Sequence, residues 1–399
     1  MKTINNYSIK NKNLLLRVDL NVPVVDGVIT DKSRIISIKS SINKLIERKN
    51  KIFLISHFGR PKGKYNKKFS LEFICQILGK ELGVNKIDFM NGINIDEIRD
   101  QQKKMKFGEI CLFENIRFYE GEEKNDLNFA KKLSECFDVY INDAFSVSHR
   151  NHASIVGITK YLPSLAGDNL LNEINNLNLF LHNPKKPNTA IIGGSKISTK
   201  IEILKNLVEY FDNIAICGAM ANTFLLAKGL KVGKSLAEHK LIDVAKKILT
   251  QGKNFNCNII LPVDVVCSKG LKDLNNIRHS KVENILPNQM ILDIGDKSIK
   301  KINKILLRSS MILWNGPLGA FEYKPFNHAT MEIANTIKKN SKMLNIMTLA
   351  GGGDTISAIK MAKAEDSFSY ISNAGGAFLE WLEGKESPGI RALKANTLF

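Results

Sequence analysis

The chain repeats one pattern along its length: a short apolar run, then glycine or polar residues, then a segment with apolar residues at helical spacing. Strands that alternate with helices form parallel sheets, because parallel neighbours need a crossover connection and a helix supplies it. The pattern therefore predicts an α/β protein whose parallel sheets carry helices on both faces. The apolar runs lie at residues 13–20, 51–58, 109–116, 138–145, 189–194, 213–219, 258–266, 311–316 and 345–353.

The length favours two domains, because 399 residues exceed a typical single domain. A boundary is expected within residues 161–188. Apolar periodicity runs there from about Leu170 to Leu181, and Pro184 and Pro187 follow. This order predicts a connecting helix and then a turn.

The charge balance is strongly basic, with 58 Lys and Arg against 39 Asp and Glu and a net charge of +19. Such a balance favours anionic partners. The lysines occur as dispersed singles and pairs, without a basic block, zinc-finger spacing or an RNP motif. We therefore expect small anionic substrates and no nucleic acid as the main partner.

The first residues are polar, and no apolar run approaches the roughly 20 residues that cross a bilayer. We expect a cytoplasmic protein without a signal peptide and without a membrane partner. The six cysteines are scattered singly and form no CxxC pair, which argues against structural zinc or a disulfide framework.

Basic residues in the first half follow the expected strand ends. They are Arg17, Arg34, His57, Arg60, Arg117 and Arg150. Ligands gather at the carboxyl ends of parallel strands, and guanidinium groups bind phosphate and carboxylate bidentately. Converging arginines therefore predict a site for a small, multiply charged anion. Asp19 and Asn21 alternate along one strand and could hold a hydroxyl there, whereas His57 alone fits a packed core histidine equally well.

Three glycine-rich turns mark the second half, within 191–204, 314–322 and 349–362. Free amides and the dipole at a helix N-terminus favour phosphate, so these turns predict a nucleotide site. If a helix begins near Ser195, two lysines four residues apart share one face and both reach phosphate oxygens. These lysines are Lys196 and Lys200. Asp354 directly follows three glycines, where a carboxylate is placed to meet Mg²⁺.

Other fingerprints are excluded. GLKVGKS at 229–235 has its two glycines one residue too close for a P-loop and follows a helical pattern, so we interpret it as a loop. GxGxxG, HRD, DFG and GxSxG are absent.

The ordered motifs RVDLNVP, SHFGRPKG, ENIRFYEGE, DAFSVSHR, GGSKISTK, LPVDVV, WNGPLGAFE, GGGDT and EGKESPGI resemble those of phosphoglycerate kinases, from about Asn13 to Ile390. The resemblance implies two Rossmann-like αβα domains joined by a long helix and hinge, and a monomer. Residues 1–168 with the tail 383–399 would hold 3-phosphoglycerate or 1,3-bisphosphoglycerate. Residues 169–185 would form the connecting helix, and 186–382 would hold ATP or ADP.

By motif, the resemblance assigns the substrate side first. Asp19 and Asn21 would meet the glycerate hydroxyl and carboxyl end, and Arg34 the carboxylate or acyl phosphate. The 3-phosphate would be clasped by His57, Arg60, Arg117 and Arg150.

The nucleotide side follows in the same way. Lys196 would lie beside the transferring phosphoryl group, and Glu322 would meet the ribose. The nucleotide phosphates would be met by Lys200, Gly352, Gly353, Asp354 and Thr355, with Asp354 acting through Mg²⁺. The segment 370–380 departs from the family pattern, because Tyr370, Asn373 and Ala374 replace its usual histidine, threonine and glycine.

The implied chemistry is reversible phosphoryl transfer between 1,3-bisphosphoglycerate with ADP and 3-phosphoglycerate with ATP, in glycolysis. A carboxylate is already a nucleophile at neutral pH, so catalysis reduces to alignment and charge neutralisation. Arg34, Lys196 and the backbone at Gly352 would supply the neutralisation. Two alternatives remain: a kinase for another carboxylic acid, and a catalytically idle basic binding protein with the same fold.

Overall fold

The computed structural model describes residues 1–181 and 184–398. Positions 182–183 of the expected connecting helix and position 399 of the expected tail therefore lie outside the described residues. The chain divides into two compact units. The first unit comprises Met1–Asn175 with Glu386–Phe399, and the second comprises Asn176–Lys385.

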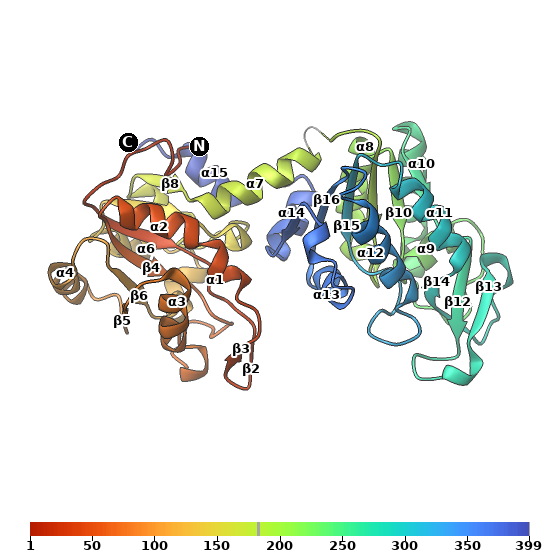
Figure 1. The fold of residues 1–399 in the computed structure, drawn as a ribbon, viewed down its shortest axis with the longest axis horizontal. Helices are drawn as coiled ribbons and strands as arrows, with labels where there is room; N and C mark the ends of the chain where they lie inside the picture. The colour runs from red at the N-terminus through yellow and green to blue at the C-terminus, as the bar shows by residue number, and fades with distance from the viewer. Residues whose placement is uncertain (182–183, 399) are drawn as a thin grey trace. The chain divides into compact units, whose positions relative to one another are not determined.

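The first unit is built on a six-stranded, wholly parallel sheet in the order β5-β6-β4-β1-β7-β8 (Figure 1). Its strands are β1 (Asn13–Arg17), β4 (Lys51–Ile55), β5 (Ile87–Met90), β6 (Ile110–Phe113), β7 (Val139–Asn142) and β8 (Ser164–Ala166). The order reverses beside β1, because the chain proceeds from β1 through β4 to one edge and then returns to β7 on the other side. Such a switch point leaves a crevice at the carboxyl ends of the strands.

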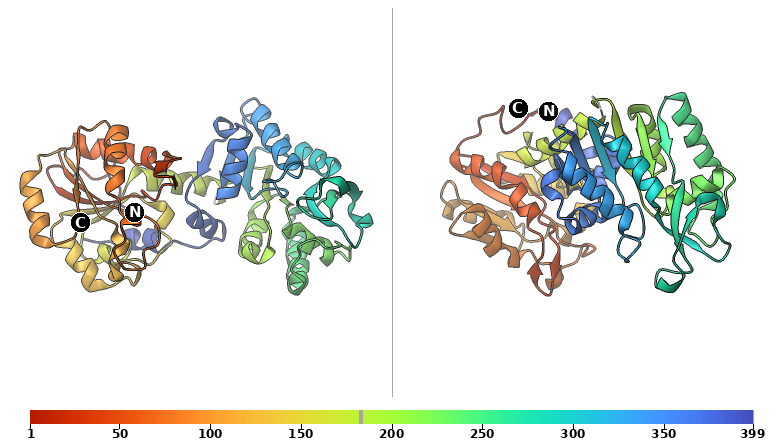
Figure 2. Two further views of the ribbon diagram at one scale, coloured as in Figure 1. Left: turned by 90° about the horizontal axis from the view of Figure 1, so that it is seen from below. Right: turned by 45° about the vertical axis from the view of Figure 1, so that its right-hand side comes forward.

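Helices surround this sheet (Figures 1 and 2). They are α1 (Ser33–Ser37), α2 (Lys39–Glu47), α3 (Cys75–Leu82), α4 (Ile95–Lys104), α5 (Glu120–Glu123), α6 (Leu127–Ser134) and α15 (Pro388–Ala395). The helix α7 (Asp168–Leu181) begins in the first unit, and its residues from Asn176 onward belong to the second. A small hairpin joins β2 (Val24–Val25) to β3 (Val28–Ile29). Residues 14–17 of the central strand β1 are all buried, as expected where helices cover both faces.

The tail returns to the first unit through hydrogen bonds. The amide of Gly389 donates to the carbonyl of Ser148 at 2.8 Å. The side-chain amide of Asn396 donates to the carbonyls of Thr159 and Leu162, at 2.7 and 3.0 Å. The last helix, α15, thus belongs to the first core although it comes from the end of the chain.

The second unit repeats the architecture with a parallel sheet in the order β11-β10-β9-β15-β16-β17. The strands are β9 (Asn188–Ile192), β10 (Asn213–Ile216), β11 (Asn258–Ile260), β15 (Met311–Asn315), β16 (Met347–Gly351) and β17 (Tyr370–Ser372). Its helices are α8 (Ile201–Tyr210), α9 (Met220–Ala227), α10 (Ile242–Asn254), α11 (Asp296–Leu306), α12 (His328–Asn340), α13 (Gly353–Met361) and α14 (Gly376–Leu382). The strand order reverses between β9 and β15.

A separate antiparallel sheet has the order β13-β12-β14. Its strands are β12 (Asp264–Ser268), β13 (Arg278–Lys281) and β14 (Met290–Ile294). The prediction of one strand over 258–266 is wrong, because this run is divided between β11 and β12, which lie in different sheets. Pro262 lies in the break, and proline has no amide hydrogen for a ladder. Each of the other apolar runs contains a strand of a parallel sheet.

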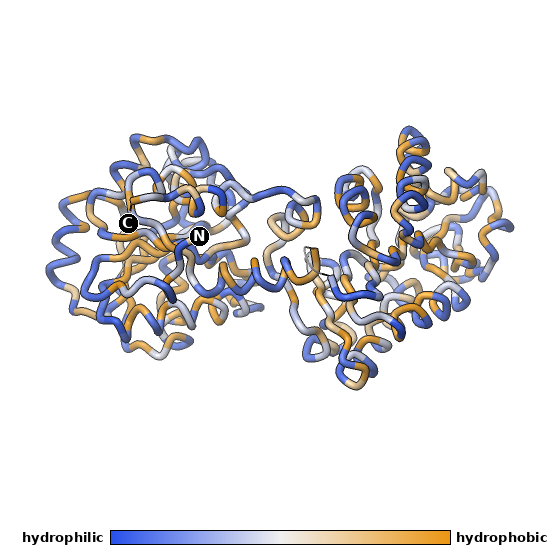
Figure 3. The backbone as a smooth tube through the Cα atoms, turned by 90° about the horizontal axis from the view of Figure 1, so that it is seen from above, coloured by the Kyte–Doolittle hydropathy of each residue, from blue (hydrophilic) through white to orange (hydrophobic). Residues whose placement is uncertain are grey.

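Each unit has its own apolar core, and Figure 3 shows the hydrophobic segments of the chain in the interior of each unit. In the described residues, no helix combines the length and the apolar character that a bilayer crossing requires.

Candidate active site

The polar residues of the first unit follow β1, β4, β6 and β7, which are neighbours in the sheet. Asp19 lies two residues after β1, and His57 lies two residues after β4. Arg117 lies in the 3₁₀ helix η3 (Ile116–Phe118) after β6, and Arg150 lies beyond η4 (Phe145–Val147) after β7. Because these strands are parallel, their carboxyl ends lie at the same end of the sheet, and all four positions lie there.

Asp19 and Arg34 form the best-defined contact of this group. The Nη1 of Arg34 lies 2.8 Å from Oδ2 of Asp19 and donates to the carbonyl of Asn21 at 2.9 Å. The Ser146 hydroxyl also donates to the Asp19 carboxylate. Burial alone would raise the pKa of Asp19, but Arg34, His57 and the hydrogen bonds that the carboxylate accepts from Ser146 and from the amide of Asn21 lower it to about 2. Asp19 is thus a fixed negative charge that holds the Arg34 guanidinium in place.

The side chain of Asn21 is held by a hydrogen bond from the loop that follows β4. Its Oδ1 accepts a hydrogen bond from the amide of Gly59 at 3.0 Å. The structure thus brings Asp19, Asn21 and Arg34 together. The prediction that Asp19 and Asn21 alternate along one strand is wrong, because β1 ends at Arg17 and both residues lie in the loop that follows it.

His57 is buried, with 4% of its surface exposed. Its Nδ1 lies 3.2 Å from Nη2 of Arg17. Burial, together with Arg17, Arg117 and Arg34, holds the pKa of His57 well below its usual value, although Asp19 opposes the shift. Its position after a strand placed His57 among the basic residues, but at neutral pH it is a neutral hydrogen-bonding group, because its buried site already contains guanidinium charges.

Arg117 is largely buried, and its guanidinium contacts Gly59 and Glu123. Its Nη1 donates to the carbonyl of Gly59 at 2.9 Å, and its Nε lies 3.3 Å from Oε1 of Glu123. Burial lowers the pKa of Arg117, and Arg17 and Arg150 add to this effect. Arg150 therefore lies close enough to act on Arg117 electrostatically.

Arg60 and Arg150 have exposed side chains. In the part of the chain that the structure describes, neither guanidinium has a hydrogen-bond or ion-pair partner. They are unneutralised cations beside the edge that carries Asp19 and Arg34. Among the described residues, Arg60 forms no hydrogen bond or ion pair with another site residue, although its neighbour Gly59 is hydrogen-bonded to both Asn21 and Arg117.

In the second unit, the glycine turns after β9 and β15 pack backbone against backbone. A Cβ at Gly193 would lie 2.0 Å from the carbonyl oxygen of Pro317, and one at Gly316 would lie 2.2 Å from that of Gly193. These two glycines therefore serve close packing of the turns, which sequence reasoning did not anticipate.

The turn after β16 is open. Gly352 has φ 97° and precedes the first residue of α13, and a Cβ at Gly353 would meet nothing within 4 Å. Gly353 and Asp354 are exposed. The free amides at the start of α13 and the adjacent carboxylate therefore face open space.

Thr355 is buried, and its hydroxyl accepts a hydrogen bond from the amide of Gly316 at 2.7 Å. The side chain thus ties the turn after β15 to the start of α13.

Lys196 and Lys200 do not share a helical face. The expected helix start near Ser195 is wrong: residues Ile197–Thr199 form the 3₁₀ helix η6, and α8 begins at Ile201. Lys196 is extended and exposed. The Glu238 carboxylate accepts from both the amide and the hydroxyl of Ser198, at 2.9 and 2.7 Å, which fixes the short turn.

Lys200 turns inward instead. Its Nζ donates to Oδ1 of Asn315, whose Nδ2 donates to the carbonyl of Gly351 at 2.6 Å. Burial lowers the pKa of Lys200 to about 8, although Asp354 and Glu383 oppose the shift. Sequence reasoning missed Asn315, which links Lys200 to the strand that ends at the open glycine turn, although the WNGPLGAFE motif contained it.

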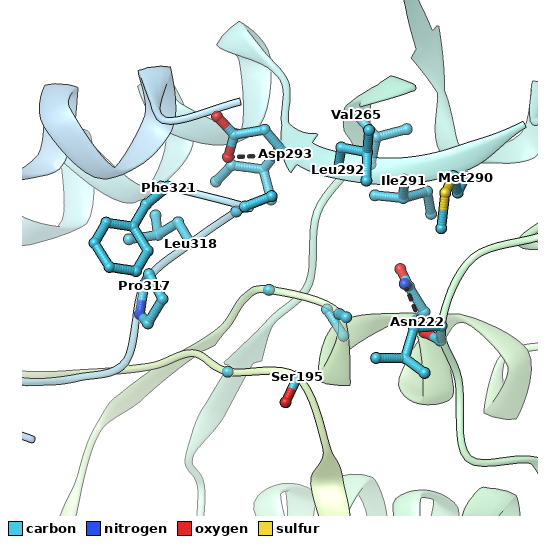
Figure 4. Close-up of a pocket in the computed structure, with 18 of the residues that line it drawn as sticks. Ser195, Asn222, Val265, Met290, Ile291, Leu292, Asp293, Pro317, Leu318 and Phe321 are labelled. Carbon is cyan, nitrogen blue, oxygen red and sulfur yellow. Dashed lines mark hydrogen bonds between the residues drawn. The ribbon is translucent and has the colours of Figure 1, made fainter. Parts of the chain in front are cut away.

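A cavity of about 360 Å³ lies beside these turns (Figure 4). Its size falls within the usual range of small-molecule sites. The walls are mainly apolar, and Figure 4 shows Pro317 and Phe321 on one side with Met290 and Leu292 across from them. Glu322 and Asp354 also line the cavity.

Asp293 lies in the cavity wall, where both its oxygens accept backbone amides. The donors are Ala329 and Ile294, each at 2.9 Å. Burial raises the pKa of this carboxyl to about 8, against the effect of both hydrogen bonds. Asp293 anchors the start of α12.

The donor set for a metal is sparse. Among the described residues, no group of three or more His, Cys, Asp or Glu side chains could hold an ion. The exposed carboxylate of Asp354 fits Mg²⁺, which keeps several waters and is bound through one or two carboxylates together with substrate phosphates.

One unit thus carries arginines arranged for a small anion, and the other carries a cavity that leads to an open glycine turn. Together these features define a two-domain phosphotransferase of the α/β class. A family model described as phosphoglycerate kinase matches residues 4–385. The chain therefore belongs to the phosphoglycerate kinase family, whose members are glycolytic kinases.

Relatives match over nearly the whole chain. A phosphoglycerate kinase of Chelativorans sp. (strain BNC1) is 44% identical over 386 residues, covering 97% of this chain and 97% of that protein. One from Rhizobium meliloti (strain 1021) is 43% identical over 394 residues, covering 98% of each.

Solved structures agree with this membership. The phosphoglycerate kinase from Coxiella burnetii has a TM-score of 0.90 and 37% identity over 98% of both chains. That from Pyrococcus horikoshii OT3 has a TM-score of 0.81 and 29% identity over 99% of this chain and 98% of the other.

Proposed function

We propose that this chain transfers a phosphoryl group reversibly between 1,3-bisphosphoglycerate with ADP and 3-phosphoglycerate with ATP. The observation that carries the proposal is that one chain contains two kinds of binding site, one in each unit. Unneutralised arginines stand beside a fixed Asp19–Arg34 pair, and a small-molecule cavity adjoins an open turn at a helix N-terminus.

The first unit is proposed to bind phosphoglycerate. Arg60 and Arg150 supply two free cations for its phosphate, because neither has a partner in the described part of the chain. Arg117 and His57 add hydrogen-bond donors to the same end. Asn21 and Asp19 hold the other end of the substrate, and Arg34 faces its carboxylate.

The second unit is proposed to bind the nucleotide. The apolar cavity takes the base, and Glu322 on its lining meets the ribose. The amides of Gly352 and Gly353, at the start of α13, and the Lys200 ammonium hold the phosphates. Thr355 acts by keeping this turn against Gly316.

Magnesium is proposed as the cofactor, held by Asp354 together with the nucleotide phosphates. When bound, it neutralises phosphate charge that the protein residues leave uncompensated. Arg34 and Lys196 then stabilise the charge that develops on the transferring group, and no side-chain base is needed because the acceptor is a carboxylate.

The reaction requires the two substrates to meet, so we propose that it proceeds through hinge closure, which also excludes water. We further propose a cytoplasmic monomer. Glycolytic chemistry on small soluble anions supports this, and no element of the mechanism requires a second copy.

The test is ATP-dependent phosphorylation of 3-phosphoglycerate by the purified chain, measured through a dehydrogenase that consumes the acyl phosphate. We expect magnesium-dependent turnover that falls sharply in Lys196→Ala and is unchanged in Lys247→Ala, an exposed lysine on α10. Equal turnover with glycerate, which lacks the phosphate, would contradict the role of Arg60 and Arg150. RNA retention on a filter without any turnover would favour the idle binding protein.

A further inference from the structure

A buried line of side-chain hydrogen bonds ends at His57, one of the residues proposed to bind phosphoglycerate. It runs from Glu122 through Ser154 and Arg17 to His57. The exposed fractions of these side chains are 0%, 0%, 1% and 4% in that order. Each contact is between side chains, so the line is independent of the backbone ladder of the sheet.

The contact at His57 determines where its proton lies. Nη2 of Arg17 is 3.2 Å from Nδ1 of His57, and a guanidinium is only a donor. Nδ1 must therefore accept, so a neutral ring carries its proton on Nε2. Within the described part of the chain, Nε2 has no hydrogen-bond partner, which leaves its N–H for a ligand.

The Glu122 carboxylate determines which group donates in the hydrogen bond between Ser154 and Arg17. Oγ of Ser154 donates to Oε1 of Glu122 at 2.7 Å, which commits the only proton of the hydroxyl. Ser154 Oγ must then accept from Nε of Arg17, at 3.1 Å. The backbone amide of Ser154 donates to Oε2 of Glu122 at 2.8 Å, so the carboxylate is held by both of its oxygens.

Charge supports the same arrangement. Burial alone would raise the pKa of Glu122, but His152, Arg17 and Ser154 lower it, so the carboxylate is ionised opposite the buried Arg17. His152 lies 3.6 Å from Glu122. The other charged groups that face His57 are Asp19, Arg34 and Arg117.

We propose that Glu122 and Ser154 are positioning residues, which act through Arg17 to hold His57 as a neutral imidazole whose Nε2–H donates to the phosphate of phosphoglycerate. This inference rests on the proposed function for the identity of the ligand. The line selects one tautomer and keeps the ring from titrating, so substrate binding does not depend on the protonation of His57.

The experiment is a long-range ¹H–¹⁵N spectrum of the histidine-labelled full chain without substrate, from pH 6 to 8. His57 is assigned by the signal that His57→Gln removes. We expect an unprotonated Nδ1, a protonated Nε2 and no titration across this range. Ser154→Ala should give mixed tautomers or a ring that titrates. It should also raise KM for 3-phosphoglycerate about tenfold, with kcat within about twofold.

Ser164→Ala is the matched control. Ser164 is equally buried and its hydroxyl donates to the carbonyl of Leu162 at 2.7 Å, but it lies outside the line. We expect it to leave the His57 signals and KM unchanged. If Ser154→Ala does not fold, Glu122→Gln, which keeps the side-chain shape, takes its place.

A protonated Nδ1 or an imidazolium in the wild-type spectrum would overturn the inference. So would a Ser154→Ala spectrum identical to that of Ser164→Ala. These spectra come from the free protein, so an absence of turnover would overturn the proposed function and leave the tautomer result standing on its own.

Discussion

At the residue scale, Arg34 is the side chain whose removal should affect chemistry most. Its guanidinium is fixed by Asp19 and by the Asn21 carbonyl, so no reorganisation is needed when charge develops on the transferring group. We expect Arg34→Ala to lower kcat at least 100-fold, about 2.7 kcal/mol of transition-state stabilisation. Steady-state assays in both directions would measure this loss. Arg391→Ala, an exposed arginine on α15, should be neutral, and an unchanged kcat in Arg34→Ala would refute the assignment.

Asp19 should make stability depend on pH in the acid range. Its pKa falls from the ordinary value of 3.8 to about 2 in the folded chain. The ionised form is therefore favoured by folding, and the stabilisation is fully present above pH 4 and is lost as the pH falls towards 2. The shift corresponds to ~2 kcal/mol.

Denaturant unfolding of wild type and Asp19→Asn checks this expectation. The difference in unfolding free energy should be largest at pH 6 to 7 and should shrink by ~2 kcal/mol near pH 2.5. Ser146→Ala, which removes a neutral donor to the same carboxylate, should show a smaller pH-dependent change. A difference that stays constant from pH 7 to pH 2.5 would show that Asp19 has an ordinary pKa.

The spacing of residue types after the strand ends predicted that Asp19, His57 and Arg117 lie near one another at the carboxyl ends of the strands. That these residues bind phosphoglycerate stays a prediction. The protonation of His57 could not be predicted from the sequence. It depends on burial and on Arg17, which lies 40 positions away in the chain. Glu122 and Ser154 were missed for the same reason, since a buried hydrogen-bonded pair leaves no periodic signal.

At the element scale, the packing of the turns after β9 and β15 leads to a stability prediction. A Cβ at Gly193 would meet the Pro317 carbonyl at 2.0 Å, and backbone cannot move aside as a flexible side chain can. We expect Gly193→Ala to lower the unfolding free energy by about 3 kcal/mol, the upper end for overpacking, and to weaken ADP binding.

Calorimetry of unfolding and of ADP binding would measure both effects. Gly270→Ala is the control, because a Cβ there would meet nothing within 4 Å and its φ is not in the left-handed region. Equal stability of the two variants would show that the turns separate without cost.

The apolar runs predicted the long central strands, because strands buried on both faces need continuous apolar sequence. The edge strands β5, β8 and β17 and the antiparallel sheet were not predicted. β8 has three residues directly after Pro163, and β13 reads RHSK with little apolar character. Such strands are fixed by pairing with a neighbour, and local sequence does not record that pairing.

At the scale of the whole molecule, the division into units was visible in length and in the proline-rich segment after Leu181. The exact positions at which the chain passes from one unit to the other could not be predicted from the sequence. The compact units divide at Asn175, inside the helix α7, and again at Lys385, in the polar connection between α14 and α15. Long-range contacts decide such boundaries, and the sequence alone does not contain them.

The return of the tail makes the stability of the first unit depend on the end of the chain. Asn396 is buried and makes three hydrogen bonds: it donates to the Thr159 and Leu162 carbonyls and accepts from the Ser164 amide at 3.1 Å. Asn396→Ala would leave these buried backbone groups unpaired, at a cost of about 2 to 3 kcal/mol.

Native-state hydrogen exchange is the measurement that locates this cost. The amides of β7 and β8 should exchange faster in Asn396→Ala, whereas those of β9 and β15 should keep wild-type protection, because the two cores are built from separate segments. Thr397→Ala, an exposed neighbour in the tail, should change neither set. Equal acceleration in both sheets would mean that the units unfold as one cooperative body, and the tail would then stabilise the whole chain rather than the first unit.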